Sequence, residues 1–157
     1  MNNFQLTPIN DSIIQEASSD WLNEAGNDLF QVEYARFFSE TLAKSQDAFY
    51  AVGIPGNPVV LAFVEIIAKQ PSVKAKFLRI TVHPSLLPLE ADGNQETLVS
   101  VYMFGIKSTF DLASVHGATE VKIYGRTDHL FGVLKTVATL LNDSPLDGFT
   151  HILENKW

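Results

Sequence analysis

The sequence has no cysteine and few basic residues, and both absences narrow the classes of protein to which it can belong. Without cysteine, the chain has no disulfide bond, no thiolate metal site and no cysteine nucleophile, and it suits a reducing compartment. Its 11 lysines and arginines are outnumbered by 18 aspartates and glutamates, which gives a formal net charge of -7. Because nucleic acids and anionic membrane surfaces are bound through clustered basic side chains, we expect neither as a partner.

Long apolar runs are also missing. No uninterrupted run of about 18 apolar residues occurs, and residues 1–10 have neither the basic nor the apolar region of a signal peptide. We therefore expect a soluble, cytoplasmic protein. A hydrophobic content of 46%, with 11 phenylalanines among 157 residues, is typical of a globular chain and predicts one domain over residues 1–157.

The spacing of apolar residues predicts ten elements in the order β-α-α-β-β-β-α-β-α-β. The predicted strands are Phe4–Ile9, Ala48–Ile54, Pro58–Ile67, Lys76–Val82, Thr119–Gly125 and Gly148–Leu153. The predicted helices are one capped by Asp11 or Ser12 and continuing to Leu22, Val32–Ala43, Leu98–Val115 closed by His116 and Gly117, and one from Thr127 or Asp128 to Leu141.

The connections between these elements predict a mixed sheet. Pro55, Gly56 and Asn57 are a hairpin signal, and the next connection is short, so the three middle strands should form an antiparallel meander. A strand-helix-strand crossover follows, which requires a parallel pair between Lys76–Val82 and Glu120–Tyr124. The predicted fold class is therefore α/β (α+β) with one mixed sheet.

This order of elements resembles the GNAT (Gcn5-related N-acetyltransferase) fold along nearly the whole chain. The segment LRITVHPSL, Leu78–Leu86, resembles the end of that family's fourth strand, where a Val-x-Pro segment leads into the loop that holds coenzyme A. The segment Gly125–Leu141 is similar to a strand-to-helix segment of small GNAT-like proteins of short-tailed phages. The resemblance implies that the strands Lys76–Val82 and Glu120–Tyr124 separate near Val82 to admit acetyl-CoA. It also implies a set of cofactor-binding positions: Ile80, Thr81, Val82, Gly93, Asn94, Gln95, Glu96 and Thr97.

This chain departs from the sequence pattern of the family's phosphate-binding loop. The family has Arg or Gln, two residues, Gly, one residue, and Gly or Ala; this chain has Glu90, Gly93 and Gln95 at those three positions. The acids Glu90, Asp92 and Glu96 oppose an anion at a helix start that offers about half a positive charge. Alternatively, Asp92 and Gln95 form a capping pair. We therefore expect no cofactor, with acetyl-CoA as the ligand only if the chain is an active enzyme.

The catalytic positions implied by the resemblance are filled only in part. Glu65 is the one carboxylate near the position of the family's general base, and Leu130–Leu141 contains no tyrosine to act as the general acid. Tyr124, at the end of the preceding strand, is the remaining candidate, although a buried structural tyrosine explains it equally. The four histidines have no metal-ligand spacing, so no metal site is predicted.

These observations predict a GNAT-like protein, phage-encoded, that serves as a non-catalytic binding or assembly module. The alternative is an active acetyl-CoA-dependent N-acyltransferase with a divergent cofactor site. If the chain is a binding module, we expect it to contact a protein partner or a second copy of the chain through aromatic and apolar residues of the first two helices and the C-terminus. The alternative is that these residues belong to the hydrophobic core. The residues are Trp21, Leu22, Leu29, Phe30, Phe37, Phe38 and Trp157.

Overall fold

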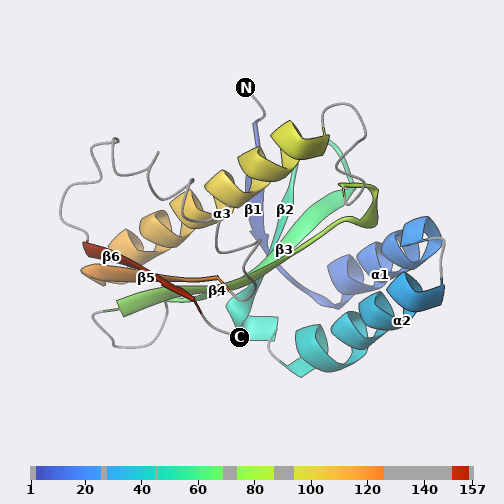
Figure 1. The fold of residues 1–157 in the computed structure, drawn as a ribbon, viewed down its shortest axis with the longest axis horizontal. Helices are drawn as coiled ribbons and strands as arrows, with labels where there is room; N and C mark the ends of the chain where they lie inside the picture. The colour runs from blue at the N-terminus through green and yellow to red at the C-terminus, as the bar shows by residue number, and fades with distance from the viewer. Residues whose placement is uncertain are drawn as a thin grey trace. The chain divides into compact units, whose positions relative to one another are not determined.

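The structure is a computed structural model that describes residues 3–25, 28–44, 46–68, 74–86, 94–125 and 150–155. It is a mixed α+β structure whose strands follow the order β1-β2-β3-β4-β5-β6 in one sheet (Figure 1). The strands are β1 Gln5–Pro8, β2 Phe49–Gly53, β3 Val60–Ile67, β4 Lys74–Val82, β5 Glu120–Gly125 and β6 Thr150–Asn155. The helices are α1 Asp11–Ala25, α2 Asp28–Arg36 and α3 Asn94–Val115.

The predicted fold class is confirmed as a mixed α+β arrangement. Each described element lies close to a predicted one, but α2 begins four residues before Val32 and α3 four residues before Leu98. For α3 the first turn, Asn94–Thr97, is polar and carries no apolar periodicity, so the apolar pattern begins only at Leu98. The helix predicted between Thr127 and Leu141 lies outside the described residues.

The N-cap of α1 differs from the prediction. The side-chain oxygen Oδ1 of Asn10 accepts the backbone N–H of Ile13 at 2.8 Å, so the cap is Asn10 rather than Asp11 or Ser12. All three residue types are good caps, and the sequence alone does not fix which of three neighbours takes the position. Asp11 instead becomes the first helical residue, where a carboxylate suits the positive end of the helix.

Two compact units make up the chain, one formed by residues 1–63 and 81–98 and the other by residues 64–80 and 99–157. Strands β3 and β4 contribute residues to both. The prediction of one domain over residues 1–157 remains a prediction.

The core of the first unit is built around Trp21 of α1, which is fully buried. The ring of Trp21 makes an edge contact with Phe38, at 5.5 Å between centroids, and a tilted contact with Phe63 of β3, at 5.2 Å. Phe37 also stacks on it. The expectation that these helix aromatics form a contact surface is therefore wrong for Trp21, Phe37 and Phe38, because all three are core residues of their own unit.

After Arg36, the second helix continues as a π-helical segment, Phe37–Leu42. The periodicity predicts an ordinary α-helix here. In an α-helix the adjacent residues Phe37 and Phe38 would point about 100° apart, yet both are buried, as is Leu42. A π-helical segment is rare and is found mostly as a single turn within an α-helix, frequently at a functional site.

The β2–β3 connection is the tight turn that its sequence predicts. The N–H of Asn57 donates to the carbonyl of Ile54 at 2.9 Å. Gly56 has a φ of +83°, which suits the third position of a type II turn after Pro55. The side chain of Asn57 then accepts the N–H of Val59 at 3.0 Å and fixes the start of the next strand.

In the second unit, β4 and β5 are parallel, as the crossover predicts. Lys74 pairs with Glu120, and the pairing continues to Phe77 and Ile123. Within the described part of the chain, β4 and β5 have no further pair beyond this point, while β5 goes on to pair with β6 as far as Gly125. The pair β5–β6 is also parallel.

Helix α3 is apolar, and most of it, from Val99 onward, belongs to the second unit. By length and composition alone, Glu96–Val115 could cross a membrane, a test that the core helix of a soluble protein also passes. Val101, Ile106 and Phe110 of this helix are buried. Its end has the predicted glycine: Gly117 has a φ of +75°, and the N–H of Ala118 donates to the carbonyl of Ala113 at 2.9 Å.

A close approach between α3 and the strands requires glycine at position 105. A Cβ added to Gly105 would lie 3.1 Å from the ring of Phe77 and 3.2 Å from a methyl group of Val64. We expect Gly105→Val to lower the free energy of unfolding by about 1–3 kcal/mol, because the added methyl groups overpack this contact. Urea denaturation measures the change.

The matched control is Ser114→Val, which places the same β-branched side chain on an exposed position of the same helix. We expect the control to change stability by no more than about 0.5 kcal/mol. Equal effects of the two substitutions would show that the contact with Phe77 and Val64 is not the cause of the loss.

Candidate functional site

The candidate site lies in the turn that follows β4, in the first unit. The turn is a short 3₁₀ helix, Pro84–Leu86, preceded by His83. Proline suits the first helical position because it has no N–H to leave unpaired and its φ is already helical. The backbone N–H of His83 donates to the carbonyl of Leu61 at 2.8 Å, and the N–H of Leu86 donates to the carbonyl of His83 at 3.0 Å. The backbone around His83 is therefore fixed on both sides.

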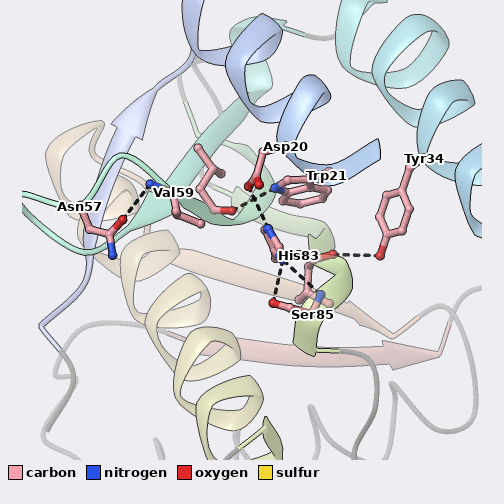
Figure 2. Close-up of polar contacts among 9 residues, drawn as sticks. Asp20, Trp21, Tyr34, Asn57, Val59, His83 and Ser85 are labelled. Carbon is pink, nitrogen blue, oxygen red and sulfur yellow. Dashed lines mark hydrogen bonds and ion pairs between the residues drawn. The ribbon is translucent and has the colours of Figure 1, made fainter. Parts of the chain in front are cut away.

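The imidazole of His83 has a partner on each ring nitrogen (Figure 2). Nε2 lies 2.9 Å from Oδ2 of Asp20 on α1, and Nδ1 lies 2.8 Å from Oγ of Ser85. The backbone N–H of Ser85 also donates to Nδ1, at 3.1 Å. An N–H can only donate, so Nδ1 is the acceptor and the ring proton sits on Nε2, which donates to the carboxylate of Asp20.

The three side chains differ in exposure. The side chain of His83 is 6% exposed and that of Asp20 is 40% exposed, while Ser85 is an exposed residue. The imidazole is thus buried beneath a serine that solvent can reach. Since the hydroxyl of Ser85 faces an accepting nitrogen, the chain of hydrogen bonds runs from Ser85 through His83 to Asp20.

Trp21 holds this arrangement in place from the core side. Its ring makes an edge contact with the imidazole of His83, with centroids 5.6 Å apart. Its Nε1–H donates to the carbonyl of Val60 at 3.0 Å, which orients the indole. Because Trp21 follows Asp20 directly, the position of the indole in the core determines where the carboxylate of Asp20 lies.

Tyr34 of α2 supplies a further bond to the end of β4. Its hydroxyl donates to the carbonyl of Val82 at 3.1 Å, inside the protein. Burial, together with the nearby charge of Glu33, raises the pKa of Tyr34 from 10.0 to about 12. The tyrosine therefore stays protonated and keeps donating at physiological pH.

The start of α3 is connected to the same turn. The side-chain amide of Asn94, the first residue of α3, donates to the carbonyl of Ser85 at 2.9 Å. Residues 87–93, which separate the two, lie outside the described residues. The turn after β4 is thus linked by hydrogen bonds to α1 through Asp20 and to the first turn of α3 through Asn94.

The positions implied for a cofactor fall at two places. Ile80, Thr81 and Val82 are the last residues of β4, and Val82 is buried. Asn94, Gln95, Glu96 and Thr97 form the first turn of α3, with Glu96 exposed. Gly93 and the side chain of Gln95 lie outside the described residues, as do Glu90 and Asp92. The assignment of these positions to a cofactor remains a prediction.

The two catalytic candidates belong to the second unit. Glu65 of β3 is 7% exposed, and its Oε1 accepts Nε–H of Arg79 on β4 at 3.0 Å. Tyr124 is in β5, where it is in register with Glu154 of β6; its side chain lies outside the described residues. The structure therefore gives Glu65 an ionic partner and leaves the role of Tyr124 untested.

Asp20, His83 and Ser85 were not among the residues predicted from the sequence. The pair His83 and Ser85 could have been noticed, because a histidine before Pro-Ser at a strand end is placed to cap the turn through its ring. Asp20 carries no such signal. It is one of many acids in the chain, and it lies 63 positions away from His83 in the sequence.

Comparisons with known proteins do not assign the site. No family model matches the chain, and neither a curated protein nor a solved structure matches it.

The bond from Tyr34 to Val82 can be tested by Tyr34→Phe. Removing the hydroxyl leaves a buried carbonyl without its donor, so we expect the free energy of unfolding at pH 7 to fall by about 1–3 kcal/mol. The folded-state pKa is above the unfolded value, so Tyr34 stabilises the fold below pH 10, and this stabilisation is lost as pH rises from 10 to about 12. The variant should therefore lose less stability than the parent over that interval.

Urea denaturation at pH 7 and at several values between pH 10 and 12 measures both effects. Tyr102→Phe is the control for alkaline pH, because burial also raises the pKa of Tyr102 to about 12. Tyr102→Phe should likewise flatten the alkaline loss. An unchanged stability of Tyr34→Phe at pH 7 would contradict a stabilising role for the bond to Val82.

Proposed function

We propose that the protein is a GNAT-like α+β protein that does not transfer acyl groups from coenzyme A and acts as a binding or assembly module. The observation that carries this proposal is that the backbone carbonyl at the end of β4 is already hydrogen-bonded inside the protein. The resemblance places the cofactor there, and an extended, amide-containing arm binds a strand through backbone groups of that strand. At Val82 the backbone carbonyl is buried and already accepts the hydroxyl of Tyr34.

The GNAT-like part of the proposal is supported by the sheet. The strands β4 and β5 are parallel neighbours, and their described pairs end at Phe77 and Ile123, before either strand ends. The family separates its fourth and fifth strands to admit the cofactor. A GNAT-like sheet would show this early end of the pairing between β4 and β5. The sheet alone is compatible with several functions.

The absence of acyl transfer is supported by the acidic loop and by Glu65. Glu90, Asp92 and Glu96 bring negative charge to a helix start where a pyrophosphate would have to bind. Glu65 is the candidate general base, and a base must have an oxygen available to the proton it removes. One of its two oxygens, Oε1, is already bonded to Arg79, and the residue is 7% exposed.

The binding part of the proposal is supported by the exposed side of α1 and α2, which pack side by side (Figure 1). An open depression of about 480 Å³ is lined by Leu22, Gln31, Val32 and Ala35. Val32 is 56% exposed, although it is apolar. A protein partner or a second copy of the chain is the class of ligand we propose for the module.

Acetyl-CoA provides the test that separates the module from an N-acyltransferase with a divergent cofactor site. We expect acetyl-CoA at about 1 mM, which is about a hundred times a Kd of about 10 μM, to leave the Tm unchanged. A bound ligand at that excess would stabilise the fold by about 2.7 kcal/mol, or about 5–10 °C for a chain of this size.

The matched variant is Glu90→Arg with Gln95→Gly, which restores the family's loop pattern around Gly93. If the acids and the missing glycine are the cause, this double variant should gain a Tm increase with acetyl-CoA that the parent does not show. A clear increase in the parent would overturn the proposal and favour the acyltransferase.

A further inference from the structure

The three side chains at the turn after β4 form a continuous acid, imidazole and hydroxyl chain. Asp20 accepts Nε2–H of His83 at 2.9 Å, and Nδ1 of His83 lies 2.8 Å from the hydroxyl oxygen of Ser85 (Figure 2). The outer member is exposed and the middle member is buried. An activated nucleophile needs these features: a hydroxyl that a reagent can reach, a base within hydrogen-bond distance, and a third group that orients the base.

We propose that Ser85 is a nucleophile activated by His83, and that this turn reacts with carboxylic esters independently of coenzyme A. The inference goes beyond the binding role proposed above and does not depend on it. Asp20 is the positioning residue, because its carboxylate bonds to the imidazole of His83 and acts on Ser85 only through that ring.

The reaction follows from the assigned tautomer. Oγ of Ser85 adds to the ester carbonyl carbon while its proton passes to Nδ1 of His83, and the imidazolium that forms is stabilised by the carboxylate of Asp20. The carbon–oxygen bond to the alcohol then breaks, and the same proton leaves with the alcohol. Water repeats the two steps on the acyl-serine, releasing the carboxylic acid and restoring Ser85.

The backbone N–H of Ser85 also donates to Nδ1 of His83 and so helps to orient the imidazole. It fixes the rotation of the imidazole so that Nδ1 faces the serine. A cap of the 3₁₀ turn needs only that one bond. The second bond from the hydroxyl and the carboxylate on the opposite nitrogen are additional to the cap, and they are the features of a proton-transfer chain.

The surroundings also suit the charge that develops in the reaction. The amide of Asn94 donates to the carbonyl of Ser85, which brings the first turn of α3 to this residue. A helix start offers partial positive charge from N–H groups that have no acceptor within the helix. The oxygen that becomes negative is the carbonyl oxygen of the ester bound to Oγ of Ser85, next to the residue that Asn94 ties to the first turn of α3.

A fluorophosphonate probe tests the nucleophile directly in the full chain. Oγ of Ser85 would form a bond to phosphorus and displace fluoride, leaving a stable adduct whose mass and position are measured by intact mass spectrometry and peptide mapping. We expect one adduct per chain, on Ser85. Ser85→Ala should lose it, whereas Ser19→Ala, a change at an exposed serine of α1, should keep the parent's rate.

The role of Asp20 is tested by two substitutions. Asp20→Asn keeps the shape of the side chain and removes its charge, so we expect the labelling rate to fall at least about tenfold. Asp20→Glu should retain more of the rate than Asp20→Asn, since it restores a carboxylate. Thermal unfolding of each variant shows whether the fold is intact.

One result that overturns the proposal comes from the parent protein alone. A folded parent protein that gains no adduct on Ser85, or that labels Ser19 equally, would show that the three side chains are only a cap. An Asp20→Asn variant that is folded and labels at the parent's rate would overturn the activation by the Asp20–His83 pair. The acetyl-CoA experiment reads a different property, so failure of one proposal leaves the other standing.

Discussion

The first unit depends on the burial of Trp21. A single indole has edge, stacked or tilted contacts with Tyr34, Phe37, Phe38 and Phe63, and its N–H satisfies the carbonyl of Val60. Large aromatic rings supply much of the burial energy of a small core, and the polar N–H gives the ring one orientation. Because α1 is anchored through this residue, the neighbouring positions of α1 are fixed as well.

The position of Asp20 is the first consequence of the burial of Trp21. A carboxylate one residue before a buried tryptophan lies at the edge of the core, where it is partly exposed and still reaches the imidazole of His83. The turn after β4 brings His83 to the same place, because the backbone of His83 is bonded to Leu61 and its side chain rests on Trp21. The candidate site is thus a by-product of core packing as much as of any local motif. Its polar groups are satisfied: among the described residues, no fully buried side-chain nitrogen or oxygen is without a hydrogen-bond partner.

The second unit shows a different constraint, the close approach of a helix to a sheet. Gly105 allows the backbone of α3 to contact Phe77 and Val64, and the parallel strands β4 and β5 lie in register beside that contact. Glu65 and Arg79 form an ion pair that compensates the burial of the carboxylate.

Most of the secondary structure was determined by the sequence itself, through local rules. The proline and glycine of the β2–β3 turn, the glycine after α3 and the apolar periods of the strands depend only on backbone preferences and on burial of one face. The parallel pairing of β4 with β5 followed from a crossover that chain geometry nearly dictates.

Tertiary structure decided which polar residues meet. Asp20 and His83 are 63 positions apart, and Tyr34 and Val82 are 48 apart, so no local pattern could link them. The same packing decided that Trp21, Phe37 and Phe38 are core, since an apolar helix face predicts burial without saying against what.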